Sequence, residues 1–224
     1  MDHATAIAEL ERRGSEQTRK TYRRHGVAGD LYGVSFADLK ALKKAIKVDQ
    51  PLAESLWATG NHDARILATM IADPKAIPRK LLESWSRDLD SYVLTDALAG
   101  LVAASPNAGA LMRKWMDSDQ EWVATAGWSV LARMVGDPAS GLTDEDCSGY
   151  LETIRTTIHG RKNRVRYSMN GALIALGLRS PAFQAKAIEA AKAIGKVDVD
   201  HGDTSCKTPD AAAYILKAAK RRAS

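Results

Sequence analysis

The chain has 224 residues, of which 45% are apolar, and this length and composition are typical of a globular protein with a sizeable core. Thirty-two Lys and Arg against 27 Asp and Glu give a formal charge of +5, which allows a polyanionic partner without requiring one. The acidic start MDHATAIAEL and the lack of an apolar run of roughly 18 residues argue against a signal peptide and a membrane span, so we expect a cytoplasmic protein without membrane contact.

Helix signals dominate the chain, and strand signals are nearly absent. Ser35 precedes an apolar-periodic run with Asp38 three residues on, which is a capping-box arrangement, and Thr208 with Pro209 opens a last helix. The pattern predicts an all-α protein with helices at about 16–25, 36–47, 50–59, 61–72, 78–89, 91–104, 107–117, 120–135, 143–159, 163–178, 182–194 and 209–222.

Prolines that follow helices reveal an internal repeat. Pro74, Pro106, Pro138 and Pro181 are 32, 32 and 43 residues apart, and the stretches ILATMIADP and VLARMVGDP, which end at Pro74 and Pro138, agree closely. A repeat of thirty-odd residues with two helices in each repeat is typical of an α-solenoid. In such a fold each helix pair buries its apolar face against the next pair. We therefore predict a single curved domain of HEAT-like antiparallel helix pairs over residues 1–224. The repeat core spans about 35–195, followed by a C-terminal loop and capping helix at 196–224.

Large aromatic side chains recur in the same frame. Trp57, Trp85 and Trp115 fall about 30 residues apart, near the ends of the first helices of successive pairs. A large apolar side chain at such a place fills the groove between layers, so we expect all three in the core.

One carboxylate breaks the repeat. Asp96 occupies the slot that Ala64, Trp128 and Gly171 hold in the other repeats. One interpretation is an Asp that pairs with an Arg or a neighbouring helix terminus. The other is a carboxylate that faces a groove and stabilises a developing positive charge.

Basic residues gather in three places, and each cluster alone is compatible with a solvated surface. The clusters are Arg12, Arg13, Arg19, Lys20, Arg23 and Arg24; Lys40, Lys43, Lys44 and Lys47; and Arg161, Lys162, Arg164 and Arg166. Arg65 and Arg133 lie on repeat helices that could share one groove with the third cluster. A curved basic groove would suit the phosphate backbone of a DNA duplex.

Metal-ligating residue types meet in the segment from Asp198 to Lys207, which holds His201 and Cys206. No second His or Cys stands at ligand spacing, and Cys147 and Cys206 match no zinc or redox motif. We therefore expect a turn-rich loop and predict neither a metal nor a cofactor.

Five stretches carry a resemblance to a known family: YGVSFADLKALKKAI, NHDARILATMIADP, SYVLTDALAGL, EWVATAGWSVLA and NRVRYSMNGALIALG. In order and spacing they resemble the DNA alkylation repair proteins, the AlkD-like glycosylases built from HEAT-like repeats, over roughly residues 15–195. The resemblance implies a monomer that binds duplex DNA on a concave basic face. It also implies that active members hydrolyse the glycosidic bond of cationic N-alkylated purines, such as 3-methyladenine and 7-methylguanine, without a cofactor.

The resemblance also implies site residues. Active members carry an Asp four residues after a Trp, and here Asp96 follows Tyr92 by four, so Asp96 is the expected catalytic residue and Tyr92 the aromatic beside the substrate. The expected DNA-binding residues are Arg65, Arg133, Arg161, Lys162, Arg164 and Arg166.

Two of the family's site residues are replaced. The active-site Arg falls near Ala124 or Thr125, and the second Trp falls near Gly171. Trp128, Tyr167 and Arg166 lie at neighbouring positions and are candidates to take the place of the missing Arg and Trp. A glycosylase, a DNA-binding protein without catalysis, and a HEAT-like scaffold for another protein therefore all remain open.

Overall fold

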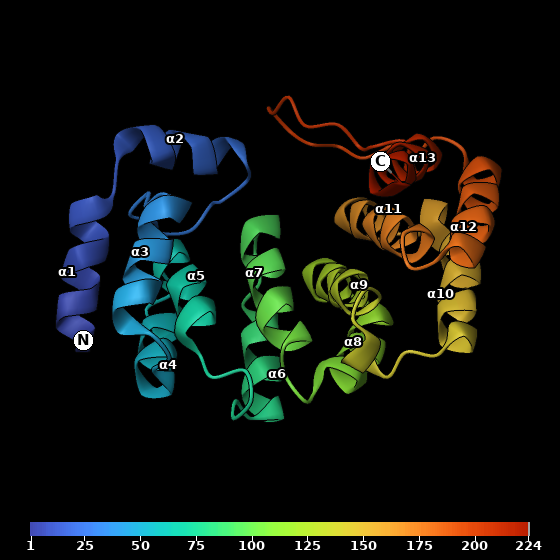
Figure 1. Ribbon diagram of the computed structural model, residues 1–224. Coiled ribbons are helices and arrows are strands. Elements are labelled where there is room, and N and C mark those ends of the chain that lie inside the picture. The colour runs from blue at the N-terminus through green and yellow to red at the C-terminus, as the bar shows by residue number, and fades with distance from the viewer. Residues whose placement is uncertain (224) are drawn as a thin grey trace. The chain divides into compact units, whose positions relative to one another are not determined.

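The computed structural model describes residues 1–223, and helices make up its regular structure (Figure 1). The α-helices are α1 (His3–Arg13), α2 (Glu16–Arg24), α3 (Phe36–Ile46), α4 (Gln50–Ala58), α5 (His62–Ile71), α6 (Arg79–Arg87), α7 (Tyr92–Ala103), α8 (Ala108–Met116), α9 (Glu121–Met134), α10 (Asp144–Thr157), α11 (Asn163–Gly177), α12 (Pro181–Ile194) and α13 (Ala211–Ala223). Two short 3-10 helices, η1 (Pro138–Ser140) and η2 (Ile158–Gly160), follow α9 and α10. The predicted all-α class is confirmed. No helix in residues 1–223 combines the length and the apolarity needed to cross a bilayer.

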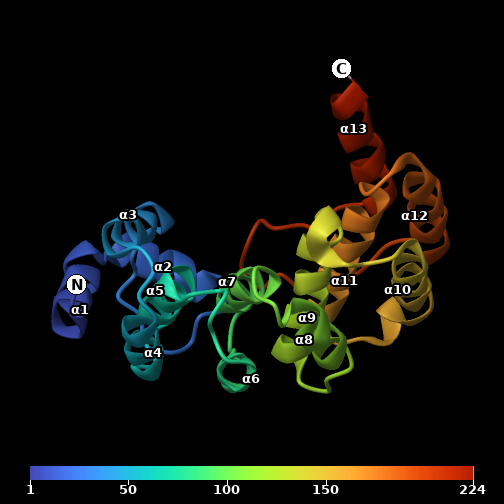
Figure 2. The ribbon, with the colours of Figure 1, turned by 60° about the horizontal axis from the view of Figure 1, so that its bottom comes forward.

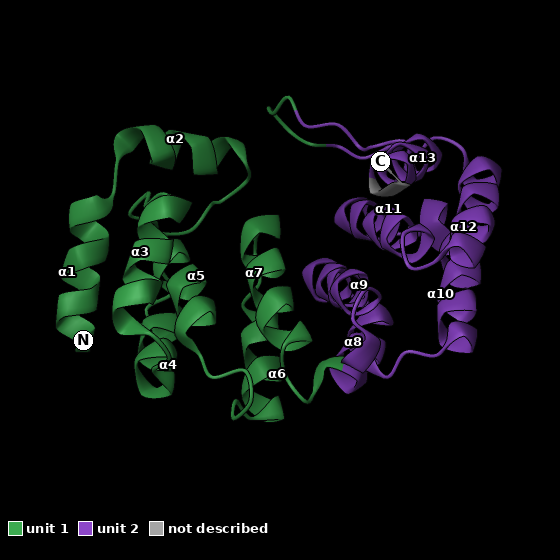
Figure 3. Ribbon diagram, viewed as in Figure 1, with its two compact units in different colours: residues 1–108, 201–205 green, residues 109–200, 206–224 purple. Residues whose placement is uncertain are grey.

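Two compact units make up the chain (Figure 3). Unit 1 holds residues 1–108 and 201–205, and unit 2 holds residues 109–200 and 206–224. Each unit has its own packed interior, and the single curved domain inferred from the repeat stays a prediction.

The repeat seen in the sequence corresponds to helix pairs. Pro74, Pro106 and Pro138 lie just beyond the ends of α5, α7 and α9, and Pro181 is the first residue of α12, directly after α11. A proline lacks the N–H that a helix interior needs but fits the first turn of the next segment, so each one separates consecutive pairs.

Helix α5 forms the centre of unit 1. It packs against α3, α4 and α7, and Ile66, Leu67 and Ile71 are completely buried on it. Between α4 and α6 the rings of Trp57 and Trp85 stack, with centroids 4.3 Å apart and planes 2° from parallel. Trp115 is likewise buried on α8, so the predicted core role of the three tryptophans is confirmed.

A buried carboxylate ties the start of α5 to the loop before α3. Asp63 is fully buried, and its oxygens accept backbone N–H groups of Tyr32, Gly33 and Val34 at 2.7, 2.9 and 2.8 Å. Charge-assisted hydrogen bonds of this kind compensate for the loss of water around a carboxylate. Asp63 therefore fixes the entry of the chain into α3.

Helices α9 and α11 form the centre of unit 2. They pack against each other, and α11 also contacts α10, α12 and α13, while α10 and α12 contact one another (Figure 2). Small residues allow the close approaches. A Cβ added at Gly127 on α9 would lie 2.6 Å from Met116 N and 2.9 Å from Trp115 C, both in the backbone of α8.

The structure departs from the sequence-based prediction at both ends. Helix α1 was not predicted, although Asp2 caps it by accepting the N–H of Thr5 and its Ala6 and Leu10 are buried. At the other end α13 begins at Ala211 rather than Pro209, because Asp210 accepts the N–H of Ala213.

Candidate nucleic-acid interface

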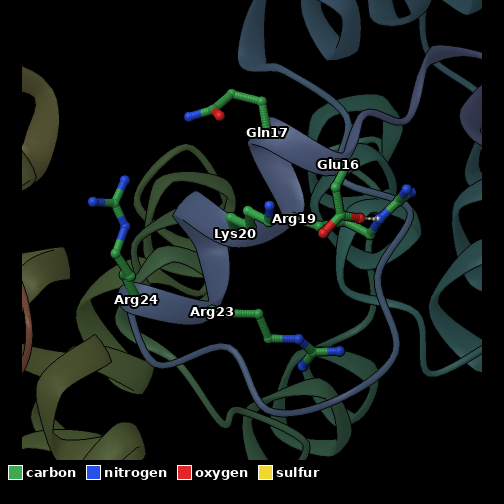
Figure 4. A pocket seen from close by; sticks show the side chains of 6 residues that line it. All are labelled: Glu16, Gln17, Arg19, Lys20, Arg23 and Arg24. Carbon is green, nitrogen blue, oxygen red and sulfur yellow. Dashed lines mark hydrogen bonds and ion pairs between the residues drawn. The ribbon is translucent and has the colours of Figure 1, made fainter.

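Helix α2 carries a basic surface in unit 1. Ser15 caps it by accepting the N–H of Thr18, and in Figure 1 it runs crosswise to α1 and α3. Only Tyr22 is buried on this helix, and Gln17, Lys20 and Arg24 recur at helical spacing on its solvent side. A shallow depression of about 620 Å³ lies over the helix (Figure 4), and its lining residues are Glu16, Gln17, Arg19, Lys20, Arg23 and Arg24.

Several basic residues of the N-terminal cluster are already engaged within the protein. Arg12 and Arg13 hydrogen-bond to Glu9 and hold the pKa of its carboxyl at about 2. Arg19 donates to Glu16 and to the carbonyl of Tyr32.

Arg23 is exposed, but its guanidinium donates to the carbonyls of Val27 and Gly29, both at 2.8 Å. Lys20 and Arg24 are exposed too, and within residues 1–223 neither side chain forms an ion pair or a hydrogen bond. We call Lys20, Arg23 and Arg24 the α2 basic surface. Lys20 and Arg24 are the two cations of this surface whose side chains are bound to no other described residue by an ion pair or hydrogen bond.

A tight C-terminal cap fixes the end of α2. The N–H of Val27 donates to Tyr22 O at 3.1 Å, and the N–H of Gly26 donates to Arg23 O at 3.0 Å. Gly26 adopts a φ of 84°, and both Tyr22 and Val27 are buried. These are the two hydrogen bonds of a Schellman motif. His25, the last residue before this turn, therefore has a defined position.

His25 contacts the aromatic residue that the family resemblance singles out. Its Nδ1 is hydrogen-bonded to the hydroxyl of Tyr92, and the two rings meet edge to face with centroids 5.8 Å apart. Tyr92 is the first residue of α7 and is half-buried. Sequence reasoning missed His25, although Gly26 after a basic helix was a usable C-cap signal.

Asp96 lies one turn further along α7 and is exposed to solvent. Its side chain is therefore not part of the core, and its catalytic role stays a prediction. Residues four apart lie on the same side of a helix, so Asp96 and Tyr92 share one face of α7.

Arg65, expected to bind DNA, instead has intramolecular partners. Its guanidinium donates to the carbonyls of Trp57 and Asp88, each at 3.3 Å, and lies 5.3 Å from the centroid of a Trp57 ring. The Asp88 carboxylate is 3.6 Å away and also accepts the indole N–H of Trp57. Arg65 thus joins the ends of α4 and α6, which leaves few of its donors for a phosphate.

The basic cluster before α11 is also used for helix capping. Arg161 donates to the carbonyl of Met116 at the end of α8, and Lys162 Nζ donates to the carbonyl of Asp119, both at 2.6 Å. The backbone N–H of Arg164 donates to the Glu121 carboxylate at 2.7 Å. The contacts of Arg161 and Arg164 satisfy the end of α8 and the start of α11, and the contact of Lys162 holds the loop before α9. Sequence spacing could not reveal these contacts.

The remaining predicted site residues of unit 2 differ in exposure. Arg133 and Tyr167 are exposed, whereas Arg166 is half-buried. Trp128 is 2% exposed on α9, and its Nε1 has no hydrogen-bond partner among the residues that the structure describes. Trp128 thus packs in the core of unit 2, and its role beside a substrate stays a prediction.

The two replaced family positions are now placed. Ala124 and Thr125, near the position of the family's Arg, are buried on α9. Gly171, near that of the second Trp, is exposed, and a Cβ built there would meet nothing within 4 Å. Across residues 1–223 no group of three His, Cys, Asp or Glu side chains is arranged to hold a metal ion.

The succession of paired helices defines the class as a HEAT-like repeat protein. Comparison with known proteins then identifies the family. A model of the DNA alkylation repair enzyme family matches residues 6–215, so the chain belongs to that family.

Three relatives cover nearly the whole chain. Two uncharacterized proteins, one from Listeria innocua and one from Listeria monocytogenes, are each 33% identical over 220 residues, which is 95% of this chain and 95% of theirs. A solved structure superposes with a TM-score of 0.91 at 33% identity, covering 99% of this chain and 95% of that one. It is described as a new family of proteins related to the HEAT-like repeat DNA glycosylases with affinity for branched DNA structures.

Proposed function

We propose that this chain is a DNA-binding repair protein and that the α2 basic surface of unit 1 contacts the phosphate backbone. The observation that carries the proposal is the exposure of Lys20 and Arg24, whose side chains form no ion pair or hydrogen bond within residues 1–223. Exposed cations attract phosphates and release counterions when they bind. Membership of the DNA alkylation repair family supports the same class of ligand.

Branched DNA is the form of DNA that we expect to bind most tightly. The structural relative with a TM-score of 0.91 is described as having affinity for branched DNA. The test compares a three-way DNA junction with a linear duplex of the same base composition in a fluorescence anisotropy titration. Tighter binding of the junction supports the proposal, and equal binding of both forms would reduce it to general DNA binding.

Excision of alkylated bases is the second candidate, and the exposure of Asp96 favours it. Alkylation at N3 or N7 makes the purine cationic and weakens the glycosidic bond. A carboxylate near the sugar could stabilise the oxocarbenium-like transition state and orient a water, with Tyr92 against the deoxyribose. The absence of an Arg at Ala124 or Thr125 and of a Trp at Gly171 argues for the non-catalytic alternative.

Release of free methylated base separates the two candidates. Duplex DNA carrying 3-methyladenine and 7-methylguanine is incubated with the protein, and free base is quantified against a no-protein control. Release above that control establishes a glycosylase, and its absence alongside tight DNA binding favours the non-catalytic protein.

A scaffold for another protein is the third alternative, and salt dependence tests it. DNA binding through phosphates weakens steeply as the salt concentration rises. A protein scaffold would show no duplex affinity beyond that expected from a net charge of +5.

A further inference from the structure

From the contact between α2 and α5 we propose that His62 and Tyr22 form a pH-sensitive switch. It holds α2 against unit 1 while the His62 imidazole is neutral, and it releases the helix when the ring gains a proton. The effect on DNA binding rests on the proposed function, because the α2 basic surface moves with the helix.

Helix α2 is attached to unit 1 through one buried side chain. Within Glu16–Arg24 only Tyr22 is buried. Its hydroxyl donates to the carbonyl of Val34 at 2.8 Å, and its ring meets the ring of His62 edge to face, with centroids 5.3 Å apart. Segments that bury little apolar surface open at low free energy. Helix α2 can therefore lift away while the rest of unit 1 stays folded.

His62 is buried without a hydrogen-bond partner for its ring. It is the first residue of α5 and is 3% exposed, and neither ring nitrogen has a partner within residues 1–223. The neighbouring Asp63 carboxylate already accepts three backbone N–H groups of residues 32–34. A neutral imidazole leaves one N–H unsatisfied here, whereas an imidazolium would leave two and bury a charge.

The groups that act on the charge of the His62 ring come from three elements. They are Asp63 and Arg65 of α5, Arg23 of α2, and Asp90 of the segment before α7. The two acids favour the protonated ring and the two arginines oppose it, so the loss of water decides the balance, and burial lowers the pKa of His62. Burial also raises the pKa of Tyr22 to about 12, so its phenol stays neutral throughout.

The direction of the switch follows from proton linkage. When α2 lifts, the His62 ring meets water and regains the ordinary pKa of about 6.5. The open form then binds a proton more readily than the closed form, so acidification favours opening. Between about pH 7.5 and 5.5 an exposed imidazole passes from mostly neutral to mostly protonated, and the opening equilibrium should rise by up to about tenfold.

The experiment is hydrogen–deuterium exchange of the full chain at about pH 5.5, 6.5 and 7.5, corrected for the intrinsic pH dependence of exchange. Protection is read separately for the amides of α2 and α5. His62→Gln removes the titrating ring. His25→Asn is the matched control, because His25 lies at the end of α2 but bonds to Tyr92 instead. Tyr22→Phe keeps the ring and removes the hydrogen bond to Val34.

We expect the protection of the α2 amides to fall by about tenfold from pH 7.5 to 5.5 in wild type and in His25→Asn. In His62→Gln it should change by less than about twofold. The α5 amides should stay better protected than those of α2 at each pH, because Ile66 and Leu67 are fully buried. Tyr22→Phe should raise α2 exchange by about fivefold at every pH and keep the tenfold response.

Three results would overturn the switch. An equal pH response in wild type and His62→Gln excludes His62 as the titrating group. Equal opening free energies for α2 and α5 would mean that the unit unfolds as a whole. Wild-type exchange in Tyr22→Phe would show that Tyr22 does not hold α2, and this variant keeps the test decisive should His62→Gln not fold.

Adding DNA separates the switch from the proposed function. A three-way DNA junction at about 100 times its dissociation constant should raise α2 protection at pH 5.5 by about 100-fold, because only the closed helix presents the α2 basic surface. Junction binding without this increase would refute phosphate contact by α2, whereas the pH response of the free protein would still establish the switch.

Discussion

Removing the two exposed cations Lys20 and Arg24 of the α2 basic surface should reduce both the affinity for DNA and its salt dependence. The double variant Lys20→Ala/Arg24→Ala keeps the fold, because both side chains are exposed and no described residue hydrogen-bonds to either. It also leaves unchanged the capping contacts of Ser15 and the turn at Gly26.

The expected size follows from counterion release. Each phosphate contact adds about 0.9 to the slope of log affinity against log salt, so two lost contacts should lower that slope by about 1.8. A fourfold rise in salt spans about 0.6 decades, and over that range wild type should lose roughly tenfold more affinity than the variant.

The assay is a fluorescence anisotropy titration of the junction at four or more salt concentrations. Lys43→Ala/Lys44→Ala is the matched control, because it removes two exposed charges from α3 in the same unit. Equal slopes for wild type and Lys20→Ala/Arg24→Ala would refute the assignment of phosphate contacts to α2. Equal losses in both variants would show that net charge alone sets the affinity.

Four further changes test the site and the fold. If methylated base is released, Asp96→Asn should slow release by about 10²-fold without changing DNA affinity, measured in single-turnover assays; an unchanged rate removes its catalytic role. Asp63→Ala leaves three backbone N–H groups without their acceptor and should lower the unfolding free energy by roughly 3–5 kcal/mol in urea titrations; a loss below about 1 kcal/mol would contradict this. Gly127→Ala forces α8 and α9 apart and should lower the unfolding free energy by about 2 kcal/mol in the same assay. An unchanged unfolding free energy would contradict the close packing of these two helices. Burial lowers the pKa of His62, so its neutral form is favoured in the folded protein. Stability should therefore fall as the pH drops below the unfolded value of about 6.5, and this loss should be smaller in His62→Gln.

The sequence by itself determined the fold class and most helix positions. Capping residues such as Ser35 and the four recurring prolines act through the backbone within a few residues, so their effect can be read locally. The repeat also predicted that Trp57, Trp85 and Trp115 are buried, because the same slot in each pair faces the next layer. Helix α1 was missed, although Asp2 directly before it is a local N-cap signal.

The tertiary structure decided which charged residues are left for a ligand. Arg65, Arg161 and Lys162 look like any other basic residues in the sequence, yet their donors reach carbonyls 8 to 45 positions away. Lys20 and Arg24, in a cluster of similar composition, have no such partner among the described residues. Whether a cation is free to bind a phosphate depends on contacts between segments distant in the chain, and neither local propensity nor spacing encodes these.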